Sequence, residues 1–278
     1  MKKFIVRTLA GALFAAVLIG AILYGWRSFT MLFLPMAVLS VEELGGLLKK
    51  HRNTTFNVEL AAACAAILFG AFAAASFIDG VSTVLLFAPY IAVVAYVFIS
   101  RLFSTKPHAL EDYAYFALTQ IYVALPFSLL NVLATAGVQE GEIYSWLMPL
   151  SVFIFIWCND SGAFCVGCTI GRHKMFERVS PKKTWEGFAG GAVVAAAAGV
   201  VMSRFFAVMN VWEWAGMALV VVAAGTLGDL VESCIKREMQ IKDSGNFLPG
   251  HGGFLDRFDS TLLAVPAVVV YLALLGLL

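Results

Sequence analysis

The chain has 278 residues, of which 61% are hydrophobic and only 13% are charged, and its formal net charge is +1. Soluble domains carry about 25% charged residues. This composition and a mean hydropathy of +0.87 exclude an ordinary soluble domain and indicate an integral membrane protein. We expect it to contact membrane lipids and no nucleic acid. No Pro-rich or Ser-rich linker, repeat or low-complexity tract divides the chain, so we expect a single integral membrane domain over residues 1–278.

Apolar segments of about 17 to 25 residues, long enough to span a bilayer, follow one another along the chain. They cover approximately 8–24, 28–48, 56–78, 81–100, 113–135, 146–170, 187–208, 211–235 and 261–278. The sequence therefore predicts an all-α, polytopic membrane protein with about nine transmembrane helices. The first segment is interpreted as an uncleaved anchor, because further spans follow it. The second carries Glu42 and Glu43, so it could bend or lie partly at the membrane interface.

The placement of positive charge predicts the orientation. If the N-terminus is cytoplasmic, all of the 19 lysines and arginines except Arg27 and Arg204 fall in segments on the cytoplasmic side. Cytoplasmic loops carry an excess of Lys and Arg. We therefore expect a cytoplasmic N-terminus and a C-terminus on the opposite side.

A polar stretch, residues 233–260, lies between the last two apolar segments and reads SCIKREMQIKDSGNFLPGHGGFLDRFDS. Its cations, carboxylates and glycines together suggest a metal and phosphate site. The candidate residues are Lys236, Arg237, Lys242, Asp243, His251, Gly252, Gly253, Asp256 and Arg257. The turn 249–253 leads into a helix N-terminus and offers backbone N–H groups to a phosphate, although His251 could be a phosphate donor, an acid or only a loop residue.

Two carboxylates are the candidate metal ligands. Asp229 lies about two helical turns inside the membrane, where an ionised group facing lipid costs at least about 2.5 to 3.5 kcal/mol, so it should face a wet cavity or a cation. Asp256 lies near the N-terminus of the last helix, where a carboxylate is favoured by the helix dipole. Helical spacing places Asp229, Glu232, Ser233 and Lys236 on one face of the segment. Structural alternatives are an ion pair of Asp229 with Lys236 and a simple capping role for Asp256.

Two upstream segments carry further candidates. Asp160, in the run NDSGA of the 146–170 segment, is interpreted as part of a polar cavity wall. The basic loop over 171–186 ends with Ser180, Lys182 and Lys183 before a helix, and we interpret it as a clamp for a polyphosphate. Its positive charge alone could instead serve to bind anionic headgroups.

The polar stretch closely resembles the signature of the phosphatidate cytidylyltransferases, the CDP-diacylglycerol synthases. The residues that carry the resemblance are the run from Ser233 through KDSGNFLPGHGGFLDRFD to Asp259, with NDSGAF and SPKKTWEG upstream. Phe164 and Cys168 depart from the pattern near the expected nucleotide site. The resemblance covers about residues 150–278, so we expect an N-terminal helix bundle (1–140) and a catalytic half (141–278).

The resemblance implies a transferase of lipid metabolism: a nucleotidyltransferase that moves CMP from CTP to phosphatidic acid and releases CDP-diacylglycerol and pyrophosphate for phospholipid biosynthesis. It also implies Mg²⁺ held by Asp229 and Asp256, a monovalent cation such as K⁺, and a homodimer. The expected catalytic residues are Asp229, Lys236, Arg237, Lys242, Asp243, His251, Asp256 and Arg257, and the expected cofactor-binding residues are Asp160, Ser180, Lys182, Lys183, Gly252 and Gly253. The active site should lie at the cytoplasmic face of a bacterial inner membrane.

Two other functions stay open at the level of sequence. A CTP-dependent polyprenol kinase or transferase would share the nucleotide and metal site but not the lipid. An ion-coupled transporter would use Asp160 and Asp229 as coupling-ion sites, but it needs access from both sides of the membrane, whereas the charged groups here crowd on one side.

Overall fold

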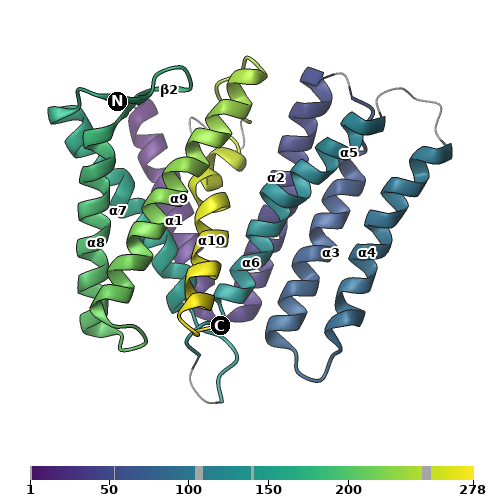
Figure 1. The fold of residues 1–278 in the computed structure, drawn as a ribbon, viewed down its shortest axis with the longest axis horizontal. Helices are drawn as coiled ribbons and strands as arrows, with labels where there is room; N and C mark the ends of the chain where they lie inside the picture. Colours follow the sequence, from purple (N-terminus) through teal and green to yellow (C-terminus); the bar gives the residue numbers. More distant parts are fainter. Residues whose placement is uncertain (1, 53, 104–108, 139–140, 246–251) are drawn as a thin grey trace. The chain divides into compact units, whose positions relative to one another are not determined.

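The computed structural model describes residues 2–52, 54–103, 109–138, 141–245 and 252–278 (Figure 1). Within these ranges the chain forms helices and one short β-hairpin. The elements are α1 (Lys2–Tyr24), α2 (Trp26–Arg52), α3 (Val58–Phe77), α4 (Thr83–Ser100), the 3₁₀ turn η1 (Arg101–Phe103), α5 (Ala109–Leu118), the π-helical turn η2 (Thr119–Ala124), α6 (Leu125–Leu133), α7 (Leu147–Ile170), β1 (Lys174–Phe176), β2 (Ser180–Thr184), α8 (Trp185–Phe205), α9 (Val211–Glu238) and α10 (Leu255–Leu274).

Each apolar segment of the sequence coincides with a helical segment. Among the described residues, eight helical segments are long and apolar enough to cross a membrane: Trp26–Arg52, Val58–Phe77, Thr83–Phe103, Ala109–Leu133, Leu147–Ile170, Trp185–Phe205, Val211–Glu238 and Leu255–Leu274. Helix α1 adds a shorter apolar stretch, Leu9–Tyr24. These helices confirm an all-α, polytopic membrane architecture, whereas the orientation of the termini stays a prediction.

The structure departs from the sequence prediction at three places. The basic loop contains an antiparallel hairpin in which Lys174 pairs with Thr184 and Phe176 with Ser180. Helix α2 continues without a break through Glu42 and Glu43 to Arg52. The last helix begins at Leu255, six residues before the apolar segment does, because polar residues fill its first turns.

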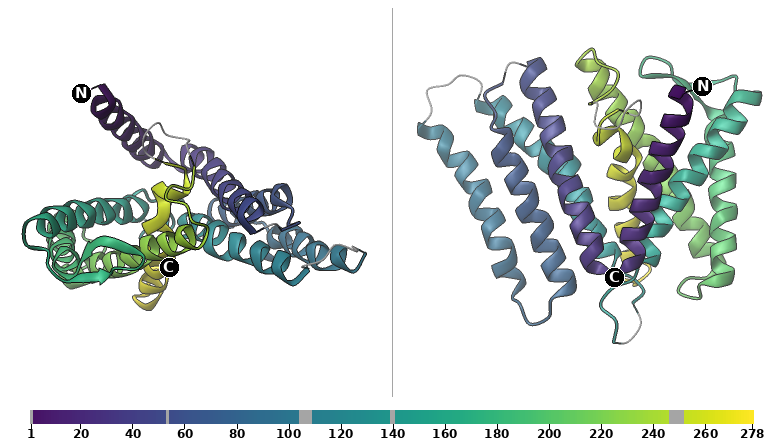
Figure 2. Two further views of the ribbon diagram at one scale, coloured as in Figure 1. Left: turned by 90° about the horizontal axis from the view of Figure 1, so that it is seen from above. Right: turned by 180° about the vertical axis from the view of Figure 1, so that it is seen from behind.

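The helices gather into two compact units: residues 1–146 with 239–257, and residues 147–238 with 258–278. In the first unit, α3 packs against α2, α4 and α6, and the right view of Figure 2 shows α3 between α2 and α4. Its core is rich in aromatic residues, and Phe29, Phe33, Phe69 and Phe127 are fully buried. A single domain over the whole chain stays a prediction.

In the second unit, α8 packs against both α7 and α9. The fully buried Trp214 of α9 meets Phe155 of α7 edge to face, with ring centroids 6.3 Å apart. The hairpin leads directly into α8, whose first turn is capped by Thr184: its hydroxyl accepts the N–H of Gly187 at 3.2 Å. Such a cap satisfies one of the donors that a helix start leaves open, so it fixes where β2 ends and α8 begins.

One buried charge cluster ties together three segments of the first unit. The Asp112 carboxylate of α5, which is 3% exposed, is paired with Arg101 of η1. It also accepts hydrogen bonds from the hydroxyls of Thr54 and Thr55, the latter at 2.7 Å. Because a buried carboxylate needs several donors to offset its lost hydration, these four residues act as one cluster.

We expect Asp112→Ala to destabilise the protein by about 3 to 5 kcal/mol, because it leaves the largely buried Arg101 without its carboxylate. Thermal unfolding of the purified protein in detergent would measure the loss. The matched control is Asp79→Ala, at an exposed position between α3 and α4, which should change stability by no more than about 0.5 kcal/mol. Equal melting temperatures for the two variants would contradict the prediction.

Candidate active site

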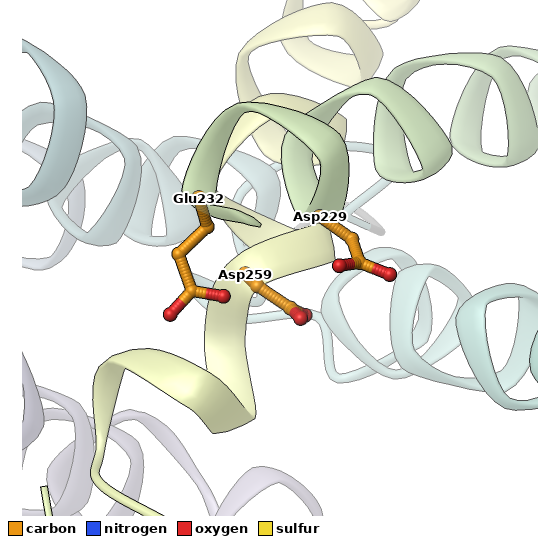
Figure 3. Close-up of side chains that lie close together, drawn as sticks. All are labelled: Asp229, Glu232 and Asp259. Atoms are coloured by element: carbon orange, nitrogen blue, oxygen red, sulfur yellow. The ribbon is translucent and has the colours of Figure 1, made fainter. Parts of the chain in front are cut away.

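Three carboxylates of the second unit form one cluster. Asp229 and Glu232 lie one turn apart on α9, and Asp259 lies on α10. One oxygen atom from each carboxylate can be chosen so that all three lie within 4.8 Å of one another. Figure 3 shows the side chain of Asp259, from α10, between those of Asp229 and Glu232, from α9. The shared helical face of Asp229 and Glu232, predicted from their spacing, thus meets a third carboxylate.

A glycine on α9 allows α10 to come this close. A Cβ atom added at Gly228 would lie 2.5 Å from the carbonyl oxygen of Asp259, a distance at which backbone atoms must move. Small residues at helix interfaces let backbones approach closely. Gly228 therefore sets the distance at which Asp259 joins the neighbouring Asp229.

Two lysines neutralise part of the cluster. Lys183 of β2 places its Nζ 2.5 Å from Asp229 Oδ2 and 3.4 Å from the carbonyl oxygen of Thr226. Lys236 places its Nζ 3.1 Å from Oε2 of the fully buried Glu232. The structural alternative that pairs Asp229 with Lys236 is therefore wrong: Asp229 is paired with a lysine from the hairpin.

The hairpin is held against α9 beside this cluster. Arg237 donates its Nε–H to the carbonyl oxygen of Val179 at 3.5 Å. At the other side of the hairpin, the Glu186 carboxylate accepts the N–H groups of Arg172 and His173 at 3.1 and 3.2 Å. These contacts fix the strand that carries Lys182 and Lys183.

A cavity of about 430 Å³ opens between α7, α8, α9 and the hairpin. Its lining includes Asn159, Asp160, Lys182, Lys183 and Thr226. Among the described residues, the side-chain oxygen of the buried Asn159 has no hydrogen-bond partner. That oxygen lies against Gly191 of α8, where an added Cβ atom would overlap it, so Asn159 belongs to the packing of α7 on α8 as well as to the cavity wall. The prediction that Asp160 lines a polar cavity agrees with this geometry.

Gly252 and Gly253, the part of the glycine-rich turn that the structure describes, lie in the first unit beside Asp256. Its Oδ2 accepts the N–H groups of Ser244 at 2.9 Å and Gly253 at 2.8 Å. Gly252 has a positive φ of 81°. The capping role considered for Asp256 is therefore present, and a metal-binding role for the same carboxylate stays a prediction.

The remaining candidates lie as follows. Lys242 and Asp243 are exposed, Arg257 is half-buried, and Ser180 begins β2 opposite Phe176. His251 lies outside the described residues. The structure thus groups Asp160, Lys182, Lys183, Asp229 and Lys236 within the second unit, while Lys242, Asp243, Asp256 and Arg257 belong to the first.

Sequence reasoning did not select five residues that the structure places at these sites. They are Glu232 and Asp259, which join Asp229 in the cluster, Asn159, which lines the cavity, Gly228, which sets the helix spacing, and Glu43, whose contacts are described below. Asn159 stands directly before Asp160 and Gly228 directly before Asp229, so a polar or small neighbour of a carboxylate was the available signal. Glu43 carried a signal too, as a carboxylate within an apolar segment.

Comparison with known proteins identifies the family of the chain. The sequence profile of the "Cytidylyltransferase family" matches residues 5–275. The chain belongs to the cytidylyltransferase family. A similar protein named "Phosphatidate cytidylyltransferase" from Bacillus subtilis (strain 168) is 32% identical over 280 residues, 96% of this chain and 97% of that protein. The resemblance inferred from the signature residues is thereby confirmed.

Relatives of the same name from Staphylococcus match a shorter region. Those of Staphylococcus aureus (strain COL) and Staphylococcus epidermidis (strain ATCC 12228 / FDA PCI 1200) are each 44% identical over 124 residues, 44% of this chain. In these alignments the chain spans about half the length of the Staphylococcus relatives, 48% in each case.

The close contact of Gly228 with α10 leads to a prediction about stability. We expect Gly228→Ala to destabilise the protein by about 1 to 3 kcal/mol, because the added methyl group overpacks the contact with α10. Gly225→Ala is the matched control: its Cβ would meet Ser260 Cβ at 3.4 Å, an ordinary contact, so the gain in helix propensity should leave stability unchanged or up to about 1 kcal/mol higher. Thermal unfolding of both variants measures the difference, and a stability loss at 225 equal to that at 228 would rule out the close approach as the cause.

Proposed function

We propose that the chain is a CTP:phosphatidate cytidylyltransferase, which converts CTP and phosphatidic acid to CDP-diacylglycerol and pyrophosphate. The observation that carries the proposal is the juxtaposition of Lys183 and Asp229, 2.5 Å apart, beside the cavity lined by Asp160 and Lys182. Carboxylates for a metal and lysines for phosphates are the two groups that a nucleotidyl transfer needs. The family profile and the names of the relatives support the same reaction.

The reaction requires little acid–base catalysis from the protein. A phosphate oxygen of phosphatidic acid attacks the α-phosphorus of CTP, the bond from that phosphorus to the bridging oxygen of the β-phosphate breaks, and the bond electrons leave with pyrophosphate. The attacking phosphate is already an anion, so no strong base is required. The barrier lies in bringing two polyanions together and in stabilising the leaving group, which positioning and fixed charge provide.

Lys182, Lys183 and Lys236 are the cations proposed to meet the phosphates. Lys182 and Lys183 lie on the strand that lines the cavity, and Lys236 is held by Glu232 at the carboxylate cluster. Each can place a point charge on a phosphate oxygen while its stem stays among apolar neighbours. We propose that Arg237, Lys242 and Arg257 complete the positive surroundings of CTP and the lipid phosphate.

The donor set of the cluster fits Mg²⁺, which takes oxygen ligands and is held by one or two carboxylates together with substrate phosphates. We propose that Asp229 and Asp256 hold this ion, and that Glu232 and Asp259 supply further oxygen atoms on the Asp229 side, as their grouping supports. When bound, Mg²⁺ would neutralise phosphate charge on the nucleotide. A second cation site for K⁺ is part of the proposal.

The cavity is proposed to hold the nucleotide. Its volume of about 430 Å³ falls within the roughly 300 to 1,000 Å³ typical of small-molecule sites. Lys182, which lines the cavity, would approach the phosphates of the nucleotide. Ser180, Asp160, Gly252 and Gly253 stay proposed nucleotide contacts.

The cellular setting follows from the same interpretation. The multi-pass helices fit a membrane protein, and the named relatives are bacterial. We propose a bacterial inner membrane, a cytoplasmic N-terminus, an active site at the cytoplasmic face and a homodimer. The distribution of Lys and Arg supports the orientation.

The first test is conversion of phosphatidic acid to CDP-diacylglycerol by the purified protein with CTP and Mg²⁺. We expect activity in the parent, and a loss of about 10²-fold or more in Asp229→Asn and in Asp256→Asn, because each removes a charge proposed to hold the ion. Asp79→Asn, an exposed aspartate between α3 and α4, is the matched control and should be active.

Product analysis separates this proposal from its alternatives. A CDP-lipid with pyrophosphate supports the transferase, whereas a phosphorylated lipid with CDP would support a polyprenol kinase, and solute uptake without CTP turnover would support a transporter. A folded parent that makes no CDP-lipid from phosphatidic acid would overturn the proposed function. An active parent with a normally active Asp229→Asn or Asp256→Asn would overturn only the metal pair.

Lys183→Met should lower kcat/KM for CTP by about 10² to 10³-fold, because it removes one positive group that faces the phosphates while keeping a side chain of similar length. The control is Lys174→Met, an exposed lysine on the partner strand β1, which should keep kcat/KM within about twofold of the parent. Steady-state kinetics with varied CTP would measure both. A Lys183 variant as active as the Lys174 variant would remove Lys183 from the proposed phosphate clamp.

A further inference from the structure

Glu43 of α2 accepts hydrogen bonds from a segment that lies more than 200 residues away in the sequence. Its Oε2 accepts the N–H of Phe254 at 2.8 Å, and its Oε1 accepts the N–H of Leu255 at 3.3 Å. The hydroxyl of Ser244 also bonds Oε1. The neighbouring Glu42 is exposed. Of the two adjacent carboxylates of α2, one is thus bonded to the start of α10 and the other faces away from the protein interior.

The same segment carries Asp256, and the carboxylates of Glu43 and Asp256 accept different backbone N–H groups of this segment. Asp256 accepts the N–H groups of Ser244 and Gly253, while Glu43 accepts those of Phe254 and Leu255. The first N–H groups of a helix have no partner within the helix. Here Glu43 accepts the N–H of Leu255, the first residue of α10, and that of Phe254 directly before it. Asp256 holds the backbone that precedes the helix, at Gly253 and Ser244, and Ser244 is bonded to both carboxylates.

The close approach of Glu43 explains a glycine of the signature. A Cβ atom added at Gly253 would overlap Oε1 of Glu43, and one added at Gly252 would overlap Oδ2 of Asp256. Only a residue without a side chain leaves room for a carboxylate at these points. The paired glycines are therefore matched to the two carboxylates that hold this backbone.

We propose that Glu43 is a positioning residue for Asp256: by holding the backbone at Phe254 and Leu255, it fixes the N–H groups that orient the Asp256 carboxylate. The role rests on the proposed function, in which Asp256 is a metal ligand. A carboxylate that is oriented before its ligand arrives loses no free energy to reorientation, and a misplacement of about 1 Å can cost on the order of 10²-fold in rate.

A glutamine at position 43 tests this role with almost no change in volume. Its amide has one acceptor oxygen and one NH₂ group. Whichever way it is turned, the NH₂ group faces the N–H of either Phe254 or Leu255, which are both donors. Glu43→Gln therefore loses at least one of these hydrogen bonds, and Glu42→Gln makes the same chemical change at the exposed position.

The experiment compares the parent, Glu43→Gln and Glu42→Gln as full-length protein in detergent. Hydrogen–deuterium exchange of the peptide covering 252–256 reports the backbone contact without any need for activity, and we expect exchange at Phe254 and Leu255 to be about tenfold faster in Glu43→Gln. The Mg²⁺ concentration for half-maximal CDP-diacylglycerol synthesis should rise, and kcat should fall by about 10 to 100-fold, with KM for phosphatidic acid unchanged. Glu42→Gln should match the parent in each measurement.

A Glu43→Gln variant with parental exchange would overturn the contact. Faster exchange with parental kcat and Mg²⁺ dependence would overturn the positioning role, because Glu43 would then only hold the fold. A parent that makes no CDP-diacylglycerol overturns the proposed function and the positioning role with it, whereas the exchange comparison still decides the contact. If Glu43→Gln does not fold, Ser244→Ala decides: it removes one bond to Glu43 and should shift exchange and Mg²⁺ dependence in the same direction, and parental values would overturn the role.

Discussion

The structure depends on one constraint: a carboxylate placed in an apolar helix must find a cation or hydrogen-bond donors. At membrane depth an unpaired charge costs at least about 2.5 to 3.5 kcal/mol. Asp229 is paired with Lys183, Glu232 with Lys236, and Asp112 with Arg101. Glu43 instead takes backbone N–H groups. Lys236 lies on the same helix as Glu232, but Lys183 comes from the hairpin, Arg101 from a 3₁₀ turn and the N–H of Phe254 from the residue before α10. Three of the four carboxylates therefore hold irregular segments at the helix ends.

Small residues allow the helices that carry these groups to pack closely together. In the second unit, Cβ atoms added at Gly190 and Gly191 would run into Val166 and Asn159 of α7. The backbone of α8 therefore lies close to α7 at the level of Asn159, one of the residues that line the cavity. Without a strong hydrophobic effect between helices in lipid, close packing of this kind is a main source of association, and here it also shapes a polar wall.

The sequence predicts those features whose signal is local. Apolar runs locate the helices, and the 3.6-residue period correctly places Asp229, Glu232 and Lys236 on one face of α9. It does not predict that Lys183 is the partner of Asp229, nor that Glu43 meets Phe254, because such contacts join residues far apart in the chain. The hairpin was missed because its strands are short and highly charged, and alternation over three to five residues is too weak a signal. The pairing of Asp229 with Asp256 stays a prediction.

The ion pair of Lys183 with Asp229 bears on how a polyanion could enter such a site. In the proposed reaction, each partner of this pair also binds a second group, since Asp229 meets a cation and Lys183 meets a phosphate. A nucleotide that arrives with its metal ion brings a cation for Asp229 and a phosphate for Lys183. The single ion pair between the two residues is then replaced by two ion pairs with the ligand, and neither residue is left with an unpaired charge at membrane depth. Lysine suits this exchange because its charge sits on a flexible four-carbon stem with three donors. A rigid, bidentate arginine would be harder to release from Asp229. On this argument, the lysine of the hairpin stays paired with Asp229 and releases it only when a phosphate is there to bind the lysine.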